Sequence, residues 1–359
     1  MIKTPTKFIA LLSGAAFLMS SAFAQGVTTD PVGYVTVDAK NGSDTYVGLT
    51  LTKASDLTTS VVSVSGLDIS VSETVAGSFA NTHYVLFSSG SQAGQWFEVT
   101  ANDAGSLTLS GGDGVTDLGV DLGISADDAF KVISFWEVDQ VFPDGVGFAA
   151  SANVFGPTAL IFINNLQAEG TNLSAAGSYF YHDGTSGFKA EGWYENGTLV
   201  DADELRLSPD TYFTIRNSSG ADFSFTLPGS VPVEVIGTAV ISDVAAQDNQ
   251  LVNPYPADLT LATSGLTLND VVAISTNVFA PSDLVFLLDN DTVGTNKSAS
   301  ASYFYHDGSS GFKTAGWYEN GTLTAADSVA IPAGAAFIVR KAAGAPAVAA
   351  WNPPTPYSL

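Results

Sequence analysis

Two segments of the chain contain the residue types that most readily bind a ligand. In each, a Tyr-His-Asp run is followed, eleven residues after the histidine, by a Trp-Tyr pair. Flat aromatic rings can stack on sugar rings, and nearby amide, carboxylate and imidazole groups can hydrogen-bond hydroxyls. The pattern therefore predicts a repeated glycan-binding platform. Its candidate residues are Tyr181, His182, Asp183, Trp193 and Tyr194 in the first segment and Tyr305, His306, Asp307, Trp317 and Tyr318 in the second.

The same residues also fit a structural interpretation. Side chains alternate between the two faces of a strand, so residues 179–181 must place at least one ring inside, and Trp193 and Trp317 are then core residues. A direct His–Asp pair for catalysis or metal binding needs a turn, because adjacent strand residues point to opposite faces. An aspartate side chain in such a turn more commonly accepts a hydrogen bond from the turn's own backbone, and we expect this of Asp183. We therefore expect no catalytic dyad here.

A loop of the second half offers oxygen ligands for a cation. Asp289, Asp291 and Asn296 lie close together in sequence, which suits calcium. The loop departs from the EF-hand pattern, since Val293 stands where an oxygen ligand is needed and no glutamate closes it. Calcium is therefore retained as a weak candidate, and no other cofactor is expected.

Enzyme motifs are absent from the sequence. The chain has no cysteine, which excludes thiol catalysis, and no Gly-x-Ser-x-Gly, Walker, His-Glu-x-x-His or dinucleotide motif. A carboxylate pair for glycoside hydrolysis has no fixed spacing. Its first candidates are Glu191, Glu195 and Glu319, although Ala315 replaces Glu191 in the second segment. We expect no catalysis and keep a polysaccharide-acting hydrolase as an alternative.

The elements that position these residues come from a duplication. Residues 153–220 align without a gap with residues 277–344, with 35 of 68 identical. A fainter match joins residues 33–47 to 237–252, and the strand at residues 49–52 to that at 259–262. The economical interpretation is that an extra module interrupts the first copy; a string of three domains is the alternative. Asn-Gly at 196–197 and 320–321 predicts type I′ hairpins.

Composition and patterning predict the fold class. Alternating β-branched and aromatic runs separated by Gly, Asn, Asp and Ser clusters are typical of antiparallel sheets. We expect an all-β fold of duplicated antiparallel β-sandwich or barrel units with an additional small β-barrel module. The expected division is a signal peptide at 1–24, a first repeat at 25–56 plus 136–230, an inserted module at 57–135, and a second repeat at 231–359.

The N-terminal segment predicts export. Lys3 and Lys7 precede an apolar run, and Ala22 and Ala24 fit a signal-peptide cleavage pattern, which places the protein outside the cell, on its surface or in the periplasm. No later run is long enough for a transmembrane helix. The net charge of −24 repels phosphate, so we expect no nucleic acid and favour polysaccharide or other cell-surface components as partners.

Two resemblances bear on these expectations. Asp-Pro-Val-Gly-Tyr at 30–34, the run at 90–97, the run at 296–303 and Trp-Asn-Pro-Pro at 351–354 resemble a family of uncharacterised exported bacterial proteins. Residues 84–100, 107–109 and 126–132 are similar to a small β module of phage and virion surface proteins. The first resemblance implies export and no assigned activity. The second implies a structural or receptor-facing module.

These observations predict an exported surface or extracellular β protein with a structural, adhesive or glycan-binding role. An outer-membrane β-barrel is an alternative. Its strands would need about 9–11 residues, and the strand signals here are shorter and irregular.

Overall fold

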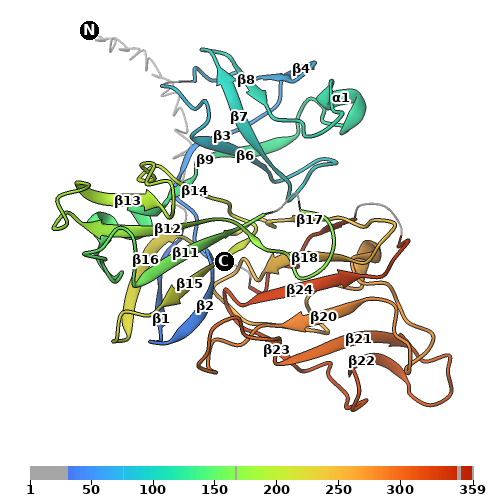
Figure 1. The fold of residues 1–359 in the computed structure, drawn as a ribbon. Helices are drawn as coiled ribbons and strands as arrows, with labels where there is room; N and C mark the ends of the chain where they lie inside the picture. The colour runs from blue at the N-terminus through green and yellow to red at the C-terminus, as the bar shows by residue number, and fades with distance from the viewer. Residues whose placement is uncertain (1–30, 76, 166–167, 346–348, 358–359) are drawn as a thin grey trace, which may run out of the picture.

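The regular secondary structure of the described residues is nearly all antiparallel β-sheet, which confirms the all-β prediction. The computed structural model describes residues 31–75, 77–165, 168–345 and 349–357. The predicted signal peptide, 1–24, lies outside the described residues. Three units each have a hydrophobic core of their own. In Figure 1 they appear as a blue, green and yellow unit, a cyan unit above it and an orange to red unit below it.

The first unit is built on a five-stranded sheet in the order β13-β12-β11-β15-β2, accompanied by the pairs β1-β16 and β10-β14. The inner face of the five-stranded sheet packs on a core centred on Trp193 and Ile215. Its elements are β1 (Val32–Ala39), β2 (Ser43–Gly48), β10 (Trp136–Glu137), α2 (Val138–Val141), η1 (Pro143–Gly145), β11 (Ala159–Asn164), β12 (Ala175–Asp183), β13 (Glu191–Glu195), β14 (Arg206–Leu207), β15 (Tyr212–Asn217) and β16 (Phe223–Ser230).

The second unit repeats this topology strand for strand. Its five-stranded sheet has the order β22-β21-β20-β24-β18, and its pairs are β17-β25 and β19-β23. The elements are β17 (Thr238–Val240), β18 (Gln247–Val252), β19 (Leu259–Thr260), η2 (Leu268–Asp270), β20 (Leu284–Leu287), β21 (Ala301–Asp307), β22 (Ala315–Glu319), β23 (Ala330–Ile331), β24 (Ala336–Lys341) and β25 (Ala349–Trp351).

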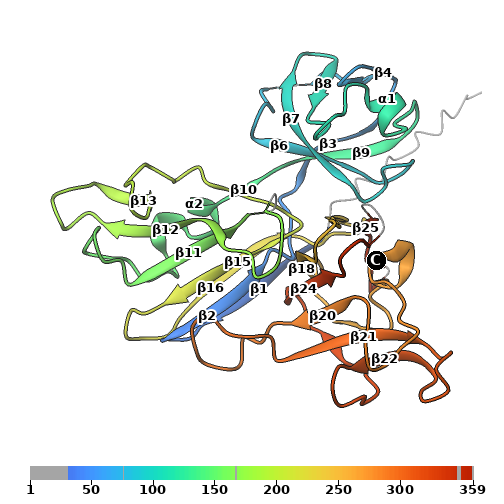
Figure 2. The same ribbon diagram turned by 45° about the vertical axis from the view of Figure 1, so that its right-hand side comes forward.

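The third unit lies in the chain between β2 and β10 and forms a seven-stranded sheet, β3-β9-β6-β7-β8-β5-β4. It appears at the top of Figure 2. Its strands run from 55 to 134, close to the residues assigned to the insert. They are β3 (Ser55–Ser60), β4 (Ser63–Ser65), β5 (Asp68–Ser70), β6 (His83–Phe87), β7 (Trp96–Asn102), β8 (Ser106–Leu109) and β9 (Ala129–Ser134), with α1 at Leu118–Asp121.

Strand pairing corrects one match made from the sequence. Leu259–Thr260 pairs with β23, and in the first repeat the equivalent β14 pairs with Trp136–Glu137. The partner of 259–260 is therefore 136–137, after the insert, and not residues 49–52 before it. The sequence match failed because two-residue strands carry too little pattern to align.

The predicted type I′ hairpins are also corrected. Gly197 has positive φ but Asn196 does not, and the next left-handed residue is Leu199, at φ 58°. The chain makes a wider turn in which Leu199 N–H donates to the carbonyl of Glu195 at 2.9 Å. Leu199 packs beside Phe180 and Tyr194, so burial of its side chain offsets the cost of its backbone conformation, about 1–2 kcal/mol. Gly321 and Leu323 do the same in the second repeat.

The two repeats dock through reciprocal contacts. Arg216 forms a bidentate pair with the buried Asp44, and Asn296 of the second repeat accepts from the same guanidinium at 2.8 Å. Arg340 pairs in the same way with Asp248, and Asn172 of the first repeat hydrogen-bonds Asp248. The interface is therefore approximately two-fold symmetric, like an isologous dimer within one chain.

Candidate functional site

The tryptophans of the predicted glycan platform lie in the cores. Trp193 is 0% exposed and packs on Phe142 and Phe148, while Trp317 is 1% exposed and packs on Tyr305. This burial contradicts a ligand platform built on them, because neither ring has a face free to stack. Of the other candidates, Tyr181, His182, Tyr194, His306 and Tyr318 are buried, Asp183 and Tyr305 are half-buried, and Asp307 is exposed.

The predicted His-Asp turn exists, and its aspartate caps it as expected. Asp183 accepts from the backbone N–H of Thr185 at 2.9 Å and from its hydroxyl at 2.7 Å. The hydroxyl and then the N–H lower the pKa of Asp183, and Ser309 has the same effect on Asp307. These carboxylates are therefore used in closing the turns.

Each buried histidine joins two loops. His182 Nδ1 lies 2.7 Å from the carbonyl oxygen of Ser151, and Nε2 lies 2.8 Å from the hydroxyl of Ser186. A carbonyl can only accept, so Nδ1 carries a proton and donates it to Ser151. Both nitrogens are occupied and buried, which leaves His182 no role as a base or metal ligand. His306 makes the same bonds to Ser275 and Ser310, at 2.8 Å each.

The loops joined by the histidine present a pair of exposed phenylalanines. Phe155 follows Ser151, and Phe188 follows Ser186; they are 72% and 71% exposed and form an edge-to-face contact with ring centroids 5.5 Å apart. In the second repeat Phe279 and Phe312, 69% and 71% exposed, form the same contact at 5.6 Å. We call these the first and second phenylalanine pairs.

Hydrogen bonds to side-chain oxygens hold the backbone at each phenylalanine of a pair. The side-chain oxygen of Asn153 accepts from Phe155 N–H at 3.0 Å, and the hydroxyl of Ser186 accepts from Phe188 N–H at 3.3 Å. The second pair has the same bonds, from Phe279 to Asn277 and from Phe312 to Ser310. Both repeats thus expose two large apolar rings to water in the same geometry. Adjacent exposed apolar side chains of this kind mark an interaction site.

Sequence reasoning missed the phenylalanine pairs because it followed histidine and tryptophan. Phe188 and Phe312 lie in Ser-Gly-Phe-Lys stretches that the structure places in the turn after each histidine, where a large apolar residue has no core to enter. That mismatch of residue type and turn was the available signal. The two members of each pair are 33 residues apart, so their contact could not be read from spacing.

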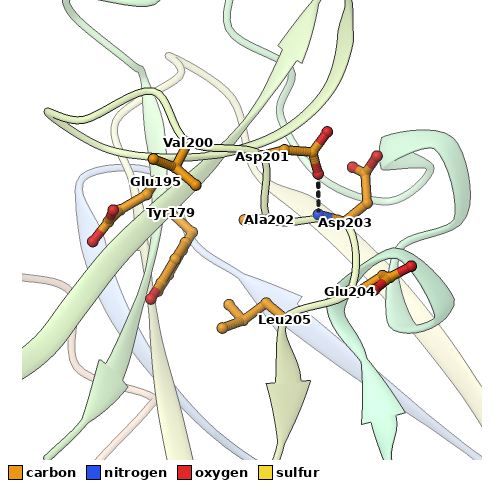
Figure 3. A pocket seen from close by; sticks show the side chains of 8 residues that line it. All are labelled: Tyr179, Glu195, Val200, Asp201, Ala202, Asp203, Glu204 and Leu205. Carbon is orange, nitrogen blue, oxygen red and sulfur yellow. Dashed lines mark hydrogen bonds between the residues drawn. The ribbon is translucent and has the colours of Figure 1, made fainter. Parts of the chain in front are cut away.

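An acidic hollow of about 630 Å³ lies beside the first repeat (Figure 3). It includes Glu195, one of the proposed catalytic carboxylates. Glu195 accepts from the hydroxyl of Thr198 at 2.5 Å, and Asp203 accepts from the N–H of Trp193 at 2.7 Å. Figure 3 shows Asp201 accepting from the N–H of Asp203. The remaining lining residues are Tyr179, Val200, Ala202, Glu204 and Leu205.

The equivalent positions of the second repeat are less acidic than this hollow. Ala325 and Ser328 take the places of Asp201 and Glu204 in the second repeat. Glu319 accepts from Thr322 at 2.7 Å, like Glu195 in its own turn, and Glu191 accepts from the Tyr181 hydroxyl at 3.0 Å. Burial is the main cause that raises the pKa of Tyr181, and the hydrogen bond to Glu191 raises it further.

The residues predicted to bind calcium make hydrogen bonds within their own loop and across the interface between the repeats. Asp289 accepts from the hydroxyl of Thr292 and from Asp291 N–H, each at 2.6 Å, and these bonds lower the pKa of Asp289. Asn296 donates its N–H to Asp44 and accepts from Arg216. The described residues contain no group of three or more His, Cys, Asp or Glu arranged to hold a metal ion.

Comparisons with family models, with curated proteins and with solved structures find no match. The two resemblances drawn from the sequence therefore stay predictions. Within the described ranges, no helix is long and apolar enough to cross a membrane.

Proposed function

We propose that this chain is an exported, non-catalytic, bivalent binding protein whose two phenylalanine pairs contact a polysaccharide of the cell surface or its surroundings. The observation that carries the proposal is the repetition, in both copies, of two rings about 70% exposed in one edge-to-face geometry. The export prediction and the resemblance to exported proteins support the location.

The surroundings of each pair contain hydrogen-bonding groups that suit a polysaccharide. Asn153 and Thr185 offer amide and hydroxyl groups near the first pair, and Asn277 and Ser309 take their places near the second. Rings beside neutral hydrogen-bonding groups match the apolar face and hydroxyl rim of a sugar. Covering a ring of this size yields about 1.5–3 kcal/mol, which is weak for one contact.

Bivalency makes these weak contacts useful. The hairpins β12–β13 and β21–β22 lie on the outer edges of the two five-stranded sheets, away from the strands that dock the repeats. Figure 1 places these hairpins at separate ends of the two repeats. A repetitive polymer can engage both pairs at once, which raises the apparent affinity by about 10²–10⁴-fold without any new contact.

The test is co-sedimentation of residues 25–359 with insoluble cellulose, chitin, xylan and alginate gels. A Phe188→Ala/Phe312→Ala variant removes one ring from each pair, and Tyr34→Ala, which removes another exposed aromatic, is the matched control. We expect binding by the wild type and the control and loss in the double variant. Equal binding by all three would overturn the proposal, and so would a folded wild type that binds none of the gels.

A further inference from the structure

A cleft of about 710 Å³ opens where the two repeats meet. It is distinct from both phenylalanine pairs, since none of the four rings lines it. Its walls come from both repeats: residues 173–178 on one side, and Leu288, Lys297 and Ile338 on the other. The cleft therefore exists only in the docked chain.

The floor of the cleft is the outer face of the first sheet. Tyr46, Thr214, Phe162 and Ser178 are neighbours in register on β2, β15, β11 and β12, and Asn196 N–H donates to the Ser178 carbonyl at 2.8 Å. All five line the cleft. Strands lie about 4.8 Å apart, so this row crosses four spacings and is about 19 Å long.

The repeats hold the cleft open by specific contacts. The Tyr46 N–H donates to Asn290 at 2.8 Å, and the Tyr46 hydroxyl donates to the carbonyl of Lys297 at 3.4 Å. The Tyr46 ring meets Tyr212 edge to face at 5.8 Å, and Arg216 lies over Phe162 at 4.9 Å. The aromatic floor is thus rigid before any ligand arrives, which reduces the entropic cost of binding.

The lining chemistry identifies the ligand class. Two acids, Asp44 and Glu195, and two bases, Arg216 and Lys297, line the cleft, so it is balanced in charge although the chain is strongly acidic. The polar lining is otherwise hydroxyl and amide, from Tyr46, Tyr212, Ser174, Ser178, Asn164, Asn196, Asn296, Thr214 and Gln250. We propose that this cleft binds a neutral oligosaccharide lying across the strands, in contact with Tyr46 and Phe162.

The second repeat supplies the matched control. Gln250 and Ile338 replace Tyr46 and Thr214 in its equivalent row, whereas Phe286, Ser302 and Asn320 are kept. Ser302 lies at the same place in the register as Ser178, on β21 opposite Phe286, but does not line the cleft. A tryptophan at Ser178 fills the cleft, and a tryptophan at Ser302 makes the same change on the equivalent sheet without filling it.

The experiment is isothermal titration of residues 25–359 with cellohexaose, xylohexaose, mannohexaose and laminarihexaose. We expect at least one of the four to bind with one site per chain. Ser178→Trp should weaken that binding at least about tenfold, and Ser302→Trp and Phe188→Ala/Phe312→Ala should leave it unchanged. Circular dichroism and thermal melting confirm that each variant is folded.

The outcomes separate this inference from the bivalent function. Two sites per chain, lost in Phe188→Ala/Phe312→Ala, would assign the sugar to the phenylalanine pairs and overturn the cleft site. Equal binding by the two tryptophan variants would overturn it as well, as would no binding of any hexaose by the wild type. One site that survives the phenylalanine substitutions supports the cleft even where co-sedimentation fails.

Discussion

The buried ion pair of the second repeat gives the sharpest stability prediction. Lys341 Nζ lies 2.5 Å from Asp283 Oδ2 and donates to the carbonyls of Asp270 and Val271, and both charged side chains are at most 3% exposed. Asp283 also accepts from two backbone N–H groups, at 2.8 Å each. Asp283→Ala leaves the buried Lys341 ammonium without its counter-ion and both N–H groups without their acceptor. Removing one partner of a buried pair costs about 3–5 kcal/mol.

The first repeat provides the rescue. Ala159 and Asn217 occupy the positions equivalent to Asp283 and Lys341, and Asn217 Nδ2 donates to two backbone carbonyls at 2.9 Å each. The double variant Asp283→Ala/Lys341→Asn copies that neutral arrangement and should recover most of the loss. Urea unfolding followed by circular dichroism measures both variants. A single variant that costs under about 1 kcal/mol, or a double variant no better than the single, would refute this reasoning.

Three further perturbations follow from the packing. Burial raises the pKa of Asp210 to about 6, so the folded wild type binds a proton more tightly than the unfolded chain and loses about 2 kcal/mol as pH rises from 4 to 6; Asp210→Asn should lack this loss, and parallel urea midpoints of the two proteins over that range would contradict it. His306→Ala releases the loops of the second phenylalanine pair, so polysaccharide binding should fall to the level of Phe312→Ala, and unchanged binding would show that the histidine does not position the rings. Gly48→Ala puts a Cβ 2.0 Å from a side chain of the other repeat and should destabilise the docked chain by about 1–3 kcal/mol, whereas Gly105→Ala meets nothing within 4 Å; equal melting temperatures would contradict that close approach.

Repetition and alternation were enough to predict the all-β class, because β-branched runs and turn residues act locally. The sequence singled out His182 and His306 as ligand-binding candidates, but the structure gives them a different role. Their residue type suggested chemistry, but burial and two occupied nitrogens make His182 a connection between loops. The sequence carries no signal of burial for a single residue, so Trp193 could not be assigned to the core with certainty before its neighbours were known.

The contacts between distant segments were beyond the reach of sequence reasoning. Asp289 and Asn296 were grouped as cation ligands because they are close in sequence. Asn296 instead contacts Asp44 and Arg216, which lie 252 and 80 residues away. Such pairings depend on how the repeats dock, and the pattern within either repeat does not specify that docking.

The most direct test of the central claim is the avidity of the two phenylalanine pairs. Wild type, Phe188→Ala, Phe312→Ala and the double variant are compared by surface plasmon resonance on the bound polysaccharide, immobilised at high and at low density. We predict that each single variant loses about 100-fold in apparent affinity at high density, that the two singles bind alike, and that the double variant does not bind. Single variants that bind as tightly as wild type at high density would contradict a bivalent protein.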